Sequence, residues 1–203
     1  GFMMSATKKL TYSALFLALC VVFPLAFHFI PNGGQILSPM HIPVLLCGMI
    51  CGPVMGLTCG LLGPLMSSLI TKMPPLSLAV LPAMMAECAV YGLVSGLLMK
   101  FVRTKSEYAD MYISLVAAML SGRIVGGITQ ALFHTSGGYS FATWVTGYFV
   151  TSLPGIAFQL ALIPSLIYLL TRAHLVEIRY PAKNVQEAEQ ATASEATTVE
   201  ENQ

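Results

Sequence analysis

The chain has 203 residues, of which 56% are hydrophobic and only 9% are charged. Soluble proteins average about 25% charged residues, so this composition excludes an ordinary soluble domain. From Leu10 to Thr71 there is no Lys, Arg, Asp or Glu. Such a stretch is long enough for about three membrane crossings of roughly 20 residues each, and we therefore expect an integral membrane protein.

Taken in chain order, the apolar runs predict an all-α integral membrane bundle of six transmembrane helices. The runs cover residues 10–30, 41–58, 60–72, 78–100, 110–134 and 144–171. We interpret the first as a transmembrane helix, because it lacks the small-x-small cleavage site of a signal peptide. The second and third lie so close together that we expect them to be short or tilted. Between the third and fourth, Pro74 and Pro75 cannot extend a helix, and we expect an ordered surface loop there.

The positions of Lys and Arg predict how the bundle is oriented. One side of the membrane receives Lys8, Lys9, Lys100, Arg103, Lys105, Arg172, Arg179 and Lys183. The connections on the other side contain only Lys72. Because cytoplasmic loops carry the excess of Lys and Arg, we expect both termini in the cytoplasm.

We divide the chain into three parts. Residues 1–9 are a cytoplasmic N-terminus, in which Gly1 and Phe2 precede two methionines and are set aside as an expression remnant. Residues 10–172 form the membrane domain, and residues 173–203 form a cytoplasmic acidic tail. After Tyr180 this tail has almost no large apolar residue, so it cannot bury a core and we expect it to be disordered.

The five cysteines all lie within apolar runs, where cysteine behaves as a small hydrophobic residue. They are Cys20, Cys47, Cys51, Cys59 and Cys88. Cys47 and Cys51 have a Cys-x3-Cys spacing, but no histidine or acidic residue lies near them on that helix. We therefore expect them to pack rather than to form a metal or redox site, and we expect no cofactor.

Two sets of small residues recur at four-residue spacing, which places each set on one helix face. The first set is Gly48, Gly52, Gly56 and Gly60. Such a ridge lets another backbone approach closely, and we expect packing within the chain rather than a sliding surface. The second set is Ala14 and Ala18 on the first run. A flat alanine patch there is a candidate surface for docking a helix of another protein.

Glu87 and Arg123 are the charged residues that lie well inside a predicted span. Their helices are antiparallel neighbours, so the two charges reach a similar depth. A charge there costs several kcal/mol unless it is paired or hydrated, and we expect both to face the bundle interior. Two interpretations stay open: a buried ion pair that only fixes helix register, and a polar cavity that one or both residues line.

Polar stripes on the last two predicted spans favour the cavity. Arg123, Gly127, Gln130 and His134 share one helical face, as do Trp144, Tyr148, Thr151, Gly155 and Gln159. Aromatic rings beside hydroxyl and amide groups suit a pocket for a small molecule. Trp144 and Tyr148 are equally typical of an interfacial aromatic belt.

Two outward connections contain polar groups beside Gly-Gly pairs, and loops of this kind above a polar stripe can form a lid. The first offers Asn32, Gln35 and His41; the second offers His134, Ser136 and Tyr139. Plain surface turns are the alternative, and His41 could be a helix cap, a gate or a ligand contact. The candidate substrate-binding residues are therefore Glu87, Tyr91, Arg123, Gln130, His134, Trp144, Tyr148, Thr151, Gln159, Asn32, Gln35 and His41.

Enzyme functions find no support in the sequence. Ser67 and Ser68 lack the Gly-x-Ser-x-Gly frame of an intramembrane protease, and there is no nucleotide-binding glycine loop. A channel is disfavoured, because the sequence offers no set of like charges that could line a pore. A structural or assembly subunit, in which Glu87 and Arg123 serve only as scaffolding, remains an alternative to a binding protein.

Several of these features together resemble the S-components, the substrate-binding subunits, of energy-coupling factor (ECF) vitamin transporters. The resemblance covers roughly residues 8–172 and is carried by the Ala14-x-x-x-Ala18 patch, by PMHIPVLLCGMICGP, and by KMPPLSLAVLPAMMAECAVYGLVSGLL. The stretch around His41 is most similar to pantothenate-type members and to relatives of queuosine-precursor or unassigned specificity.

The resemblance implies a function in the cell membrane of a prokaryote. A membrane-embedded T-component and two cytoplasmic ATPases would be the partners, which explains why this chain has no ATP-binding motif. Ala14 and Ala18 would dock the T-component. The ligand would be a vitamin or related micronutrient, and the resemblance around His41 favours pantothenate, with folate, riboflavin, biotin or a queuosine precursor as alternatives. Arg123 suits a carboxylate, which pantothenate, folate and biotin all carry. No nucleic acid partner is expected.

Overall fold

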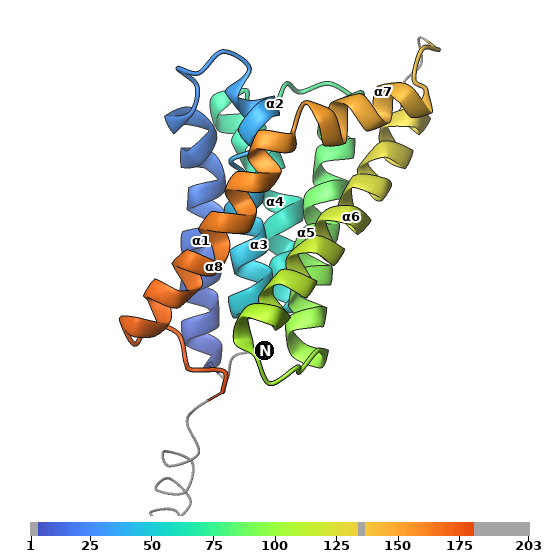
Figure 1. Cartoon of the computed structure of the whole chain (residues 1–203). Coiled ribbons are helices and arrows are strands. Elements are labelled where there is room, and N and C mark those ends of the chain that lie inside the picture. The colour runs from blue at the N-terminus through green and yellow to red at the C-terminus, as the bar shows by residue number, and fades with distance from the viewer. Residues whose placement is uncertain (1–3, 134–136, 181–203) are drawn as a thin grey trace, which may run out of the picture.

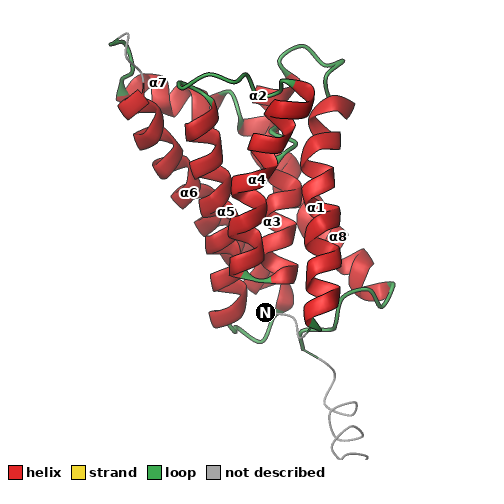
Figure 2. Cartoon of the chain, turned by 180° about the vertical axis from the view of Figure 1, so that it is seen from behind, coloured by secondary structure: helices red, strands yellow, loops and turns green. Residues whose placement is uncertain are grey.

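The computed structural model describes residues 4–133 and 137–180, except for the side chain of Gln35 (Figure 1). Its helices are α1 (Ala6–Ala26), α2 (Gly33–Leu37), α3 (His41–Cys51), α4 (Pro53–Thr71), α5 (Leu81–Phe101), α6 (Glu107–Phe133), α7 (Phe141–Val145) and α8 (Leu153–Arg172), with a π-helical turn at Thr146–Val150. Figure 2 shows helices joined by loops, and no strand occurs within this described part. The all-α prediction is confirmed.

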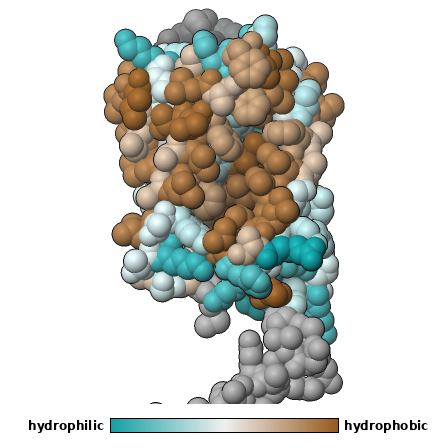
Figure 3. Space-filling view, turned by 90° about the vertical axis from the view of Figure 1, so that its left-hand side faces the viewer, coloured by the Kyte–Doolittle hydropathy of each residue, from teal (hydrophilic) through white to brown (hydrophobic). Residues whose placement is uncertain are grey.

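Five helices are long and apolar enough to cross a membrane: α1, α4, α5, α6 and α8. The second predicted span, at residues 41–58, corresponds in part to α3, which has only 11 residues. On the side of the molecule where α1 lies, an apolar band separates two more polar ends, as expected for a protein embedded in a bilayer (Figure 3). The chain is therefore a multi-pass membrane protein, and its described part contains five long apolar helices and one shorter apolar helix.

The helix α3 is the centre of the bundle. Every residue from His41 to Cys51 is buried, and α3 contacts α1, α4, α5 and α8. A helix that is apolar on all sides belongs in the interior. Since its neighbours cover it completely, α3 does not need the length of a lipid-facing span.

The boundary between the second and third predicted spans is wrong. We expected it near residues 58–60, but α3 ends at Cys51 and α4 begins at Pro53. Gly52 between them has φ = 102°, a backbone conformation that other residues rarely adopt. Pro53 has no N–H to continue α3 but fits the first turn of a new helix. The Gly52–Pro53 pair thus ends one helix and starts the next.

The four glycines do not share one helix face as expected, because Gly48 lies on α3, Gly56 and Gly60 lie on α4, and Gly52 separates the two helices. Gly48, Gly56 and Gly60 nevertheless pack closely against α5, so the predicted packing within the chain is confirmed. A Cβ added to Gly48 or Gly56 would lie 2.3 or 2.4 Å from the Gly92 carbonyl oxygen. At Gly60 the nearest atom would be the Cys88 carbonyl oxygen, at 2.3 Å. These contacts are with backbone, so only glycine fits there.

The sixth predicted span is also not one continuous helix. The chain runs through α7 and the π-helical turn, breaks at Thr151 and Ser152, and continues as α8. Pro154 lies in the first turn of α8, where its missing N–H costs nothing. The break brings the segment before α8 over the end of α6, above the bundle interior (Figure 1).

The described ends of the chain lie at the same end of the bundle (Figure 1). After α8 the chain packs back onto this end. Val176 is buried, and Arg179 Nε donates to Asp110 Oδ2 at 2.8 Å. The segment predicted as a disordered tail from residue 173 therefore starts with residues that contact the bundle. Residues 181–203 lie outside the described part.

The predicted loop before α5 owes its shape to side-chain hydrogen bonds. Ser67 and Ser68, at the end of α4, donate at 2.5 Å to the carbonyl oxygens of Met73 and Pro74. Both hydroxyls are buried. These serines therefore satisfy backbone groups that no helix can satisfy where the prolines interrupt the chain.

Candidate ligand cavity

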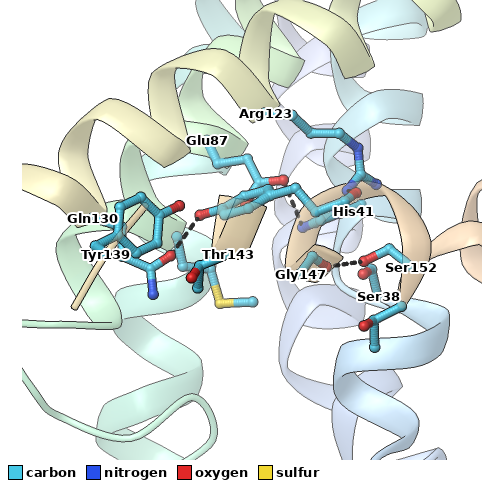
Figure 4. Close-up of a pocket in the computed structure, with 12 residues that line it drawn as sticks. Ser38, His41, Glu87, Arg123, Gln130, Tyr139, Thr143, Gly147 and Ser152 are labelled. Atoms are coloured by element: carbon cyan, nitrogen blue, oxygen red, sulfur yellow. Dashed lines mark hydrogen bonds and ion pairs between the residues drawn. The ribbon is translucent and has the colours of Figure 1, made fainter. Parts of the chain in front are cut away.

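A cavity of about 290 Å³ lies between α3, α5, α6 and the segment that runs from α7 to Ser152. Its lining includes Ser38, which follows α2, and Thr143 of α7. These helices lie at the end of the bundle opposite to the described ends of the chain (Figure 1). Of the predicted substrate-binding residues, those that line it are His41, Glu87, Arg123, Gln130, Tyr148 and Thr151. Figure 4 shows that the side chains of His41, Glu87 and Arg123 converge on the cavity.

Arg123 is almost fully buried, with 2% of its surface exposed. Its Nη1 donates to the carbonyl oxygen of Tyr148, and the guanidinium lies 5.8 Å from the ring centroid of Phe149. Its Nε and Nη2 have no hydrogen-bond partner among the described residues. These two nitrogens share one edge of the planar guanidinium, and such an edge binds a carboxylate through two parallel hydrogen bonds.

Glu87 does not form an ion pair with Arg123 in the described structure, which contradicts the scaffolding interpretation of these two charges. Its Oε1 accepts a hydrogen bond from the Tyr91 hydroxyl at 2.5 Å and lies 3.9 Å from Nε2 of His41. The imidazole of His41 packs edge-on against the Tyr91 ring, with 4.7 Å between centroids. The Glu87 carboxylate is therefore bonded to Tyr91 of its own helix and lies beside His41 of α3, and Nε and Nη2 of Arg123 are left without a partner among the described residues.

Tyr148 joins the π-helical turn to α6. Its hydroxyl donates to Oε1 of Gln130 at 3.2 Å. Gly126 makes room for the tyrosine, because a Cβ there would lie 3.0 Å from the Tyr148 hydroxyl oxygen. Tyr139, in the loop before α7, also lines the cavity. Burial, together with the negative charge of Glu87, raises the pKa of Tyr139 above its ordinary value, so this hydroxyl stays protonated.

Four other predicted site residues do not line this cavity. Tyr91 is fully buried and reaches it only through Glu87. Trp144 packs against Gly127 and donates from Nε1 to the Arg123 carbonyl oxygen at 3.0 Å, which docks α7 on α6.

The other two residues that do not line the cavity are Gln159 and Asn32. Gln159 is fully buried and donates from Nε2 to the Ser38 carbonyl oxygen at 3.2 Å. Asn32 is exposed and lines a neighbouring apolar cavity of about 530 Å³. The side chain of Gln35 and all of His134 lie outside the described residues.

The cavity includes several residues that the sequence analysis did not name as candidates. They are Ser38, Met84, Thr143, Gly147 and Ser152. Met84 precedes Glu87 by three positions, so helical spacing alone was enough to place it on the same face. The other four depend on the break before α8 and on the link between α2 and α3, for which the apolar pattern gives no signal.

The proposed docking pair lies on the outer surface of the bundle. Ala14 and Ala18 are both exposed, and the buried residues of α1 are Phe16 and Cys20. Within the described residues no group of three or more His, Cys, Asp or Glu side chains could hold a metal ion.

Comparison with known proteins assigns the chain to a family. Residues 8–167 match the family described as "ECF transporter, substrate-specific component". A search of curated proteins finds no match. The family match covers more than half of the chain, including all the residues that line the cavity. The chain therefore belongs to the substrate-specific components of ECF transporters, membrane subunits that bind the substrate and associate with a T-component and ATPases.

Proposed function

We propose that this S-component binds a small vitamin that carries a carboxylate, with pantothenate as the favoured ligand. The observation that carries the proposal is the edge of Arg123 formed by Nε and Nη2, which is buried and has no partner among the described residues. A buried guanidinium with unsatisfied donors is costly, and a ligand carboxylate would satisfy both donors at once. Glu87 does not compete for this edge, because its carboxylate interacts with Tyr91 and His41.

The size of the cavity supports a small ligand. Ligand pockets commonly have volumes of about 300–1,000 Å³, and this cavity, at about 290 Å³, lies at the lower limit. Pantothenate is a compact, flexible acid, whereas folate and riboflavin carry large ring systems. The volume therefore favours pantothenate over those two alternatives.

The test is a thermal-stability panel on the purified protein in detergent. Pantothenate, biotin, folate, riboflavin and a queuosine precursor are added separately, because a ligand that binds only the folded state raises the melting temperature. We expect pantothenate to stabilise the protein most. In Arg123→Gln the affinity for pantothenate should fall on the order of tenfold or more, since a hydrogen-bonded charge pair is lost.

Two further variants sharpen this result. Arg123→Lys keeps the charge but not the paired donors, and should lose most of the affinity as well. Arg172→Gln removes an exposed arginine at the basic end of the bundle and should bind pantothenate like the wild type. The proposal fails if riboflavin or a cationic queuosine precursor stabilises the protein while no carboxylate-bearing vitamin does.

We also propose that the basic end of the bundle faces the cytoplasm of a prokaryotic cell, and that the cavity opens toward the outside. The positive-inside rule supports this orientation. The exposed pair Ala14 and Ala18 would then dock the T-component from within the membrane.

A further inference from the structure

A second set of buried polar atoms lies on the cavity wall apart from the Arg123 edge. His41 has 3% of its surface exposed, and neither Nδ1 nor Nε2 has a hydrogen-bond partner among the described residues. Glu87 lines the same cavity with 5% exposed. Buried polar groups in folded proteins are almost always hydrogen-bonded, so unpartnered ring nitrogens on a residue that lines a cavity point to a ligand.

The two side chains are close but do not bond to each other. The 3.9 Å between His41 Nε2 and Glu87 Oε1 exceeds the length of a hydrogen bond. Tyr91 fixes both groups in this arrangement, because its hydroxyl donates to Glu87 and its ring packs against the imidazole. The pair is therefore held rigidly at a separation that one ligand atom can bridge.

The chemistry of the pair selects the ligand group. The carboxylate of Glu87 accepts hydrogen bonds, whereas a neutral imidazole offers one N–H donor and one acceptor. A hydroxyl can donate to Glu87 and accept from the N–H of His41 at the same time. An ammonium group would be repelled by the guanidinium of Arg123, which lines the same cavity, and a second carboxylate would be repelled by Glu87.

We infer that His41 and Glu87 form a hydroxyl-binding subsite, so that the ligand is a hydroxylated carboxylic acid. The carboxylate end of this ligand rests on the function proposed above for Arg123. Arg123 and the His41–Glu87 pair then recognise two different groups of one ligand. Pantothenate carries alcohol hydroxyls in addition to its carboxylate, whereas biotin has a carboxylate without an alcohol.

The experiment measures the affinity of pantothenate and of its two mono-deoxy analogues, in which one hydroxyl is replaced by hydrogen. For the wild type we expect one analogue to bind on the order of tenfold more weakly, since a hydrogen bond to a charged group is lost. His41→Phe keeps the aromatic contact with Tyr91, and Glu87→Gln keeps the shape. Both variants should bind pantothenate about as weakly as the wild type binds the weaker analogue. They should no longer distinguish pantothenate from that analogue.

Matched variants separate this inference from the proposed function. Arg123→Gln should weaken pantothenate and the analogue by the same factor, so the preference for the hydroxyl remains. If His41→Phe does not fold, His41→Asn replaces it, because asparagine retains an N–H donor. His41→Asn should still prefer pantothenate to the weaker analogue, whereas Glu87→Gln should not. If both His41→Phe and Glu87→Gln still prefer pantothenate to the weaker analogue, the hydroxyl-binding subsite is wrong. The proposed role of Arg123 in binding the carboxylate would then still stand. If no carboxylate-bearing vitamin binds the wild type, the proposed function and the subsite both fail.

Discussion

Gln159 connects the last helix to the wall of the cavity. Its Nε2 donates to the carbonyl oxygen of Ser38, which lines the cavity from the link between α2 and α3. We predict that Gln159→Leu destabilises the protein by about 0.5–1.5 kcal/mol, because the buried Ser38 carbonyl loses one of its two hydrogen-bond donors and keeps only the backbone N–H of His41. The melting temperature in detergent measures the effect, and pantothenate binding should weaken as Ser38 becomes less fixed.

Ser165→Ala on the same helix is the matched control for this prediction. The Ser165 hydroxyl is exposed and bonds only to the Ala161 carbonyl oxygen within α8. Its loss should leave the melting temperature and the affinity nearly unchanged. A Gln159→Leu protein as stable as the Ser165→Ala protein would show that the contact with Ser38 does not stabilise the fold.

Helical spacing and charge predicted the residues at the centre of the cavity, but not those on its far side. Glu87, Arg123 and Gln130 lie on long regular helices, where a period of 3.6 residues determines which side chains face inward. Gln159 follows the break at Ser152, so its direction relative to Tyr148 depends on a π-helical turn and a new helix start. The spacing of polar residues does not reveal such a change of register. The predicted polar stripe from Trp144 to Gln159 assumed one continuous helix.

Among the elements, α4 and α5 approach most closely where two glycines meet. A Cβ added to Gly92 would lie 2.0 Å from the Gly56 carbonyl oxygen, and backbone atoms cannot move aside as a flexible side chain can. We predict that Gly92→Ala costs at least roughly 1–3 kcal/mol, the usual range for overpacking. The melting temperature and the yield of monodisperse protein in detergent should both fall.

The matched control for Gly92 is Gly138→Ala. A Cβ added to Gly138 would have no atom within 4 Å, so this alanine should be tolerated. If Gly92→Ala melts at the same temperature as Gly138→Ala, the two helices can separate without cost, and glycine is not required at their crossing.

The long helices could be predicted from the sequence because lipid requires about 20 apolar residues per crossing. The same criterion fails for α3, which is covered by other helices rather than by lipid and has 11 residues. A Gly-Pro pair at Gly52 and Pro53 marks the true boundary. The repeated Cys-Gly pairs at residues 47–60 obscure this signal. Gly48 and Gly60 serve close packing, whereas Gly52 ends a helix, and the sequence does not tell the two roles apart.

At the scale of the whole molecule, the helices α2 and α7, beside which the cavity lies, and the described ends of the chain, near Met4 and Tyr180, lie at opposite ends of the bundle (Figure 1). Under the proposed orientation, a ligand enters from outside while the transport machinery acts from the cytoplasm and the membrane. The face of α1 that carries Ala14 and Ala18 runs between these two ends and is exposed. Because lipid contacts apolar side chains of any size, small residues distinguish a helix-docking surface from a lipid-facing one.

This geometry separates binding from transport, and a double variant can test the separation. We predict that Ala14→Trp combined with Ala18→Trp abolishes ATP-dependent uptake by the assembled transporter, because two indoles prevent close approach of a T-component helix. Pantothenate binding by the isolated variant should equal that of the wild type, since neither alanine lines the cavity. Ala161→Trp changes an exposed alanine on α8 and should support normal uptake. Normal uptake by the double variant would exclude this face of α1 as the docking surface, and lost binding would instead indicate a distorted bundle.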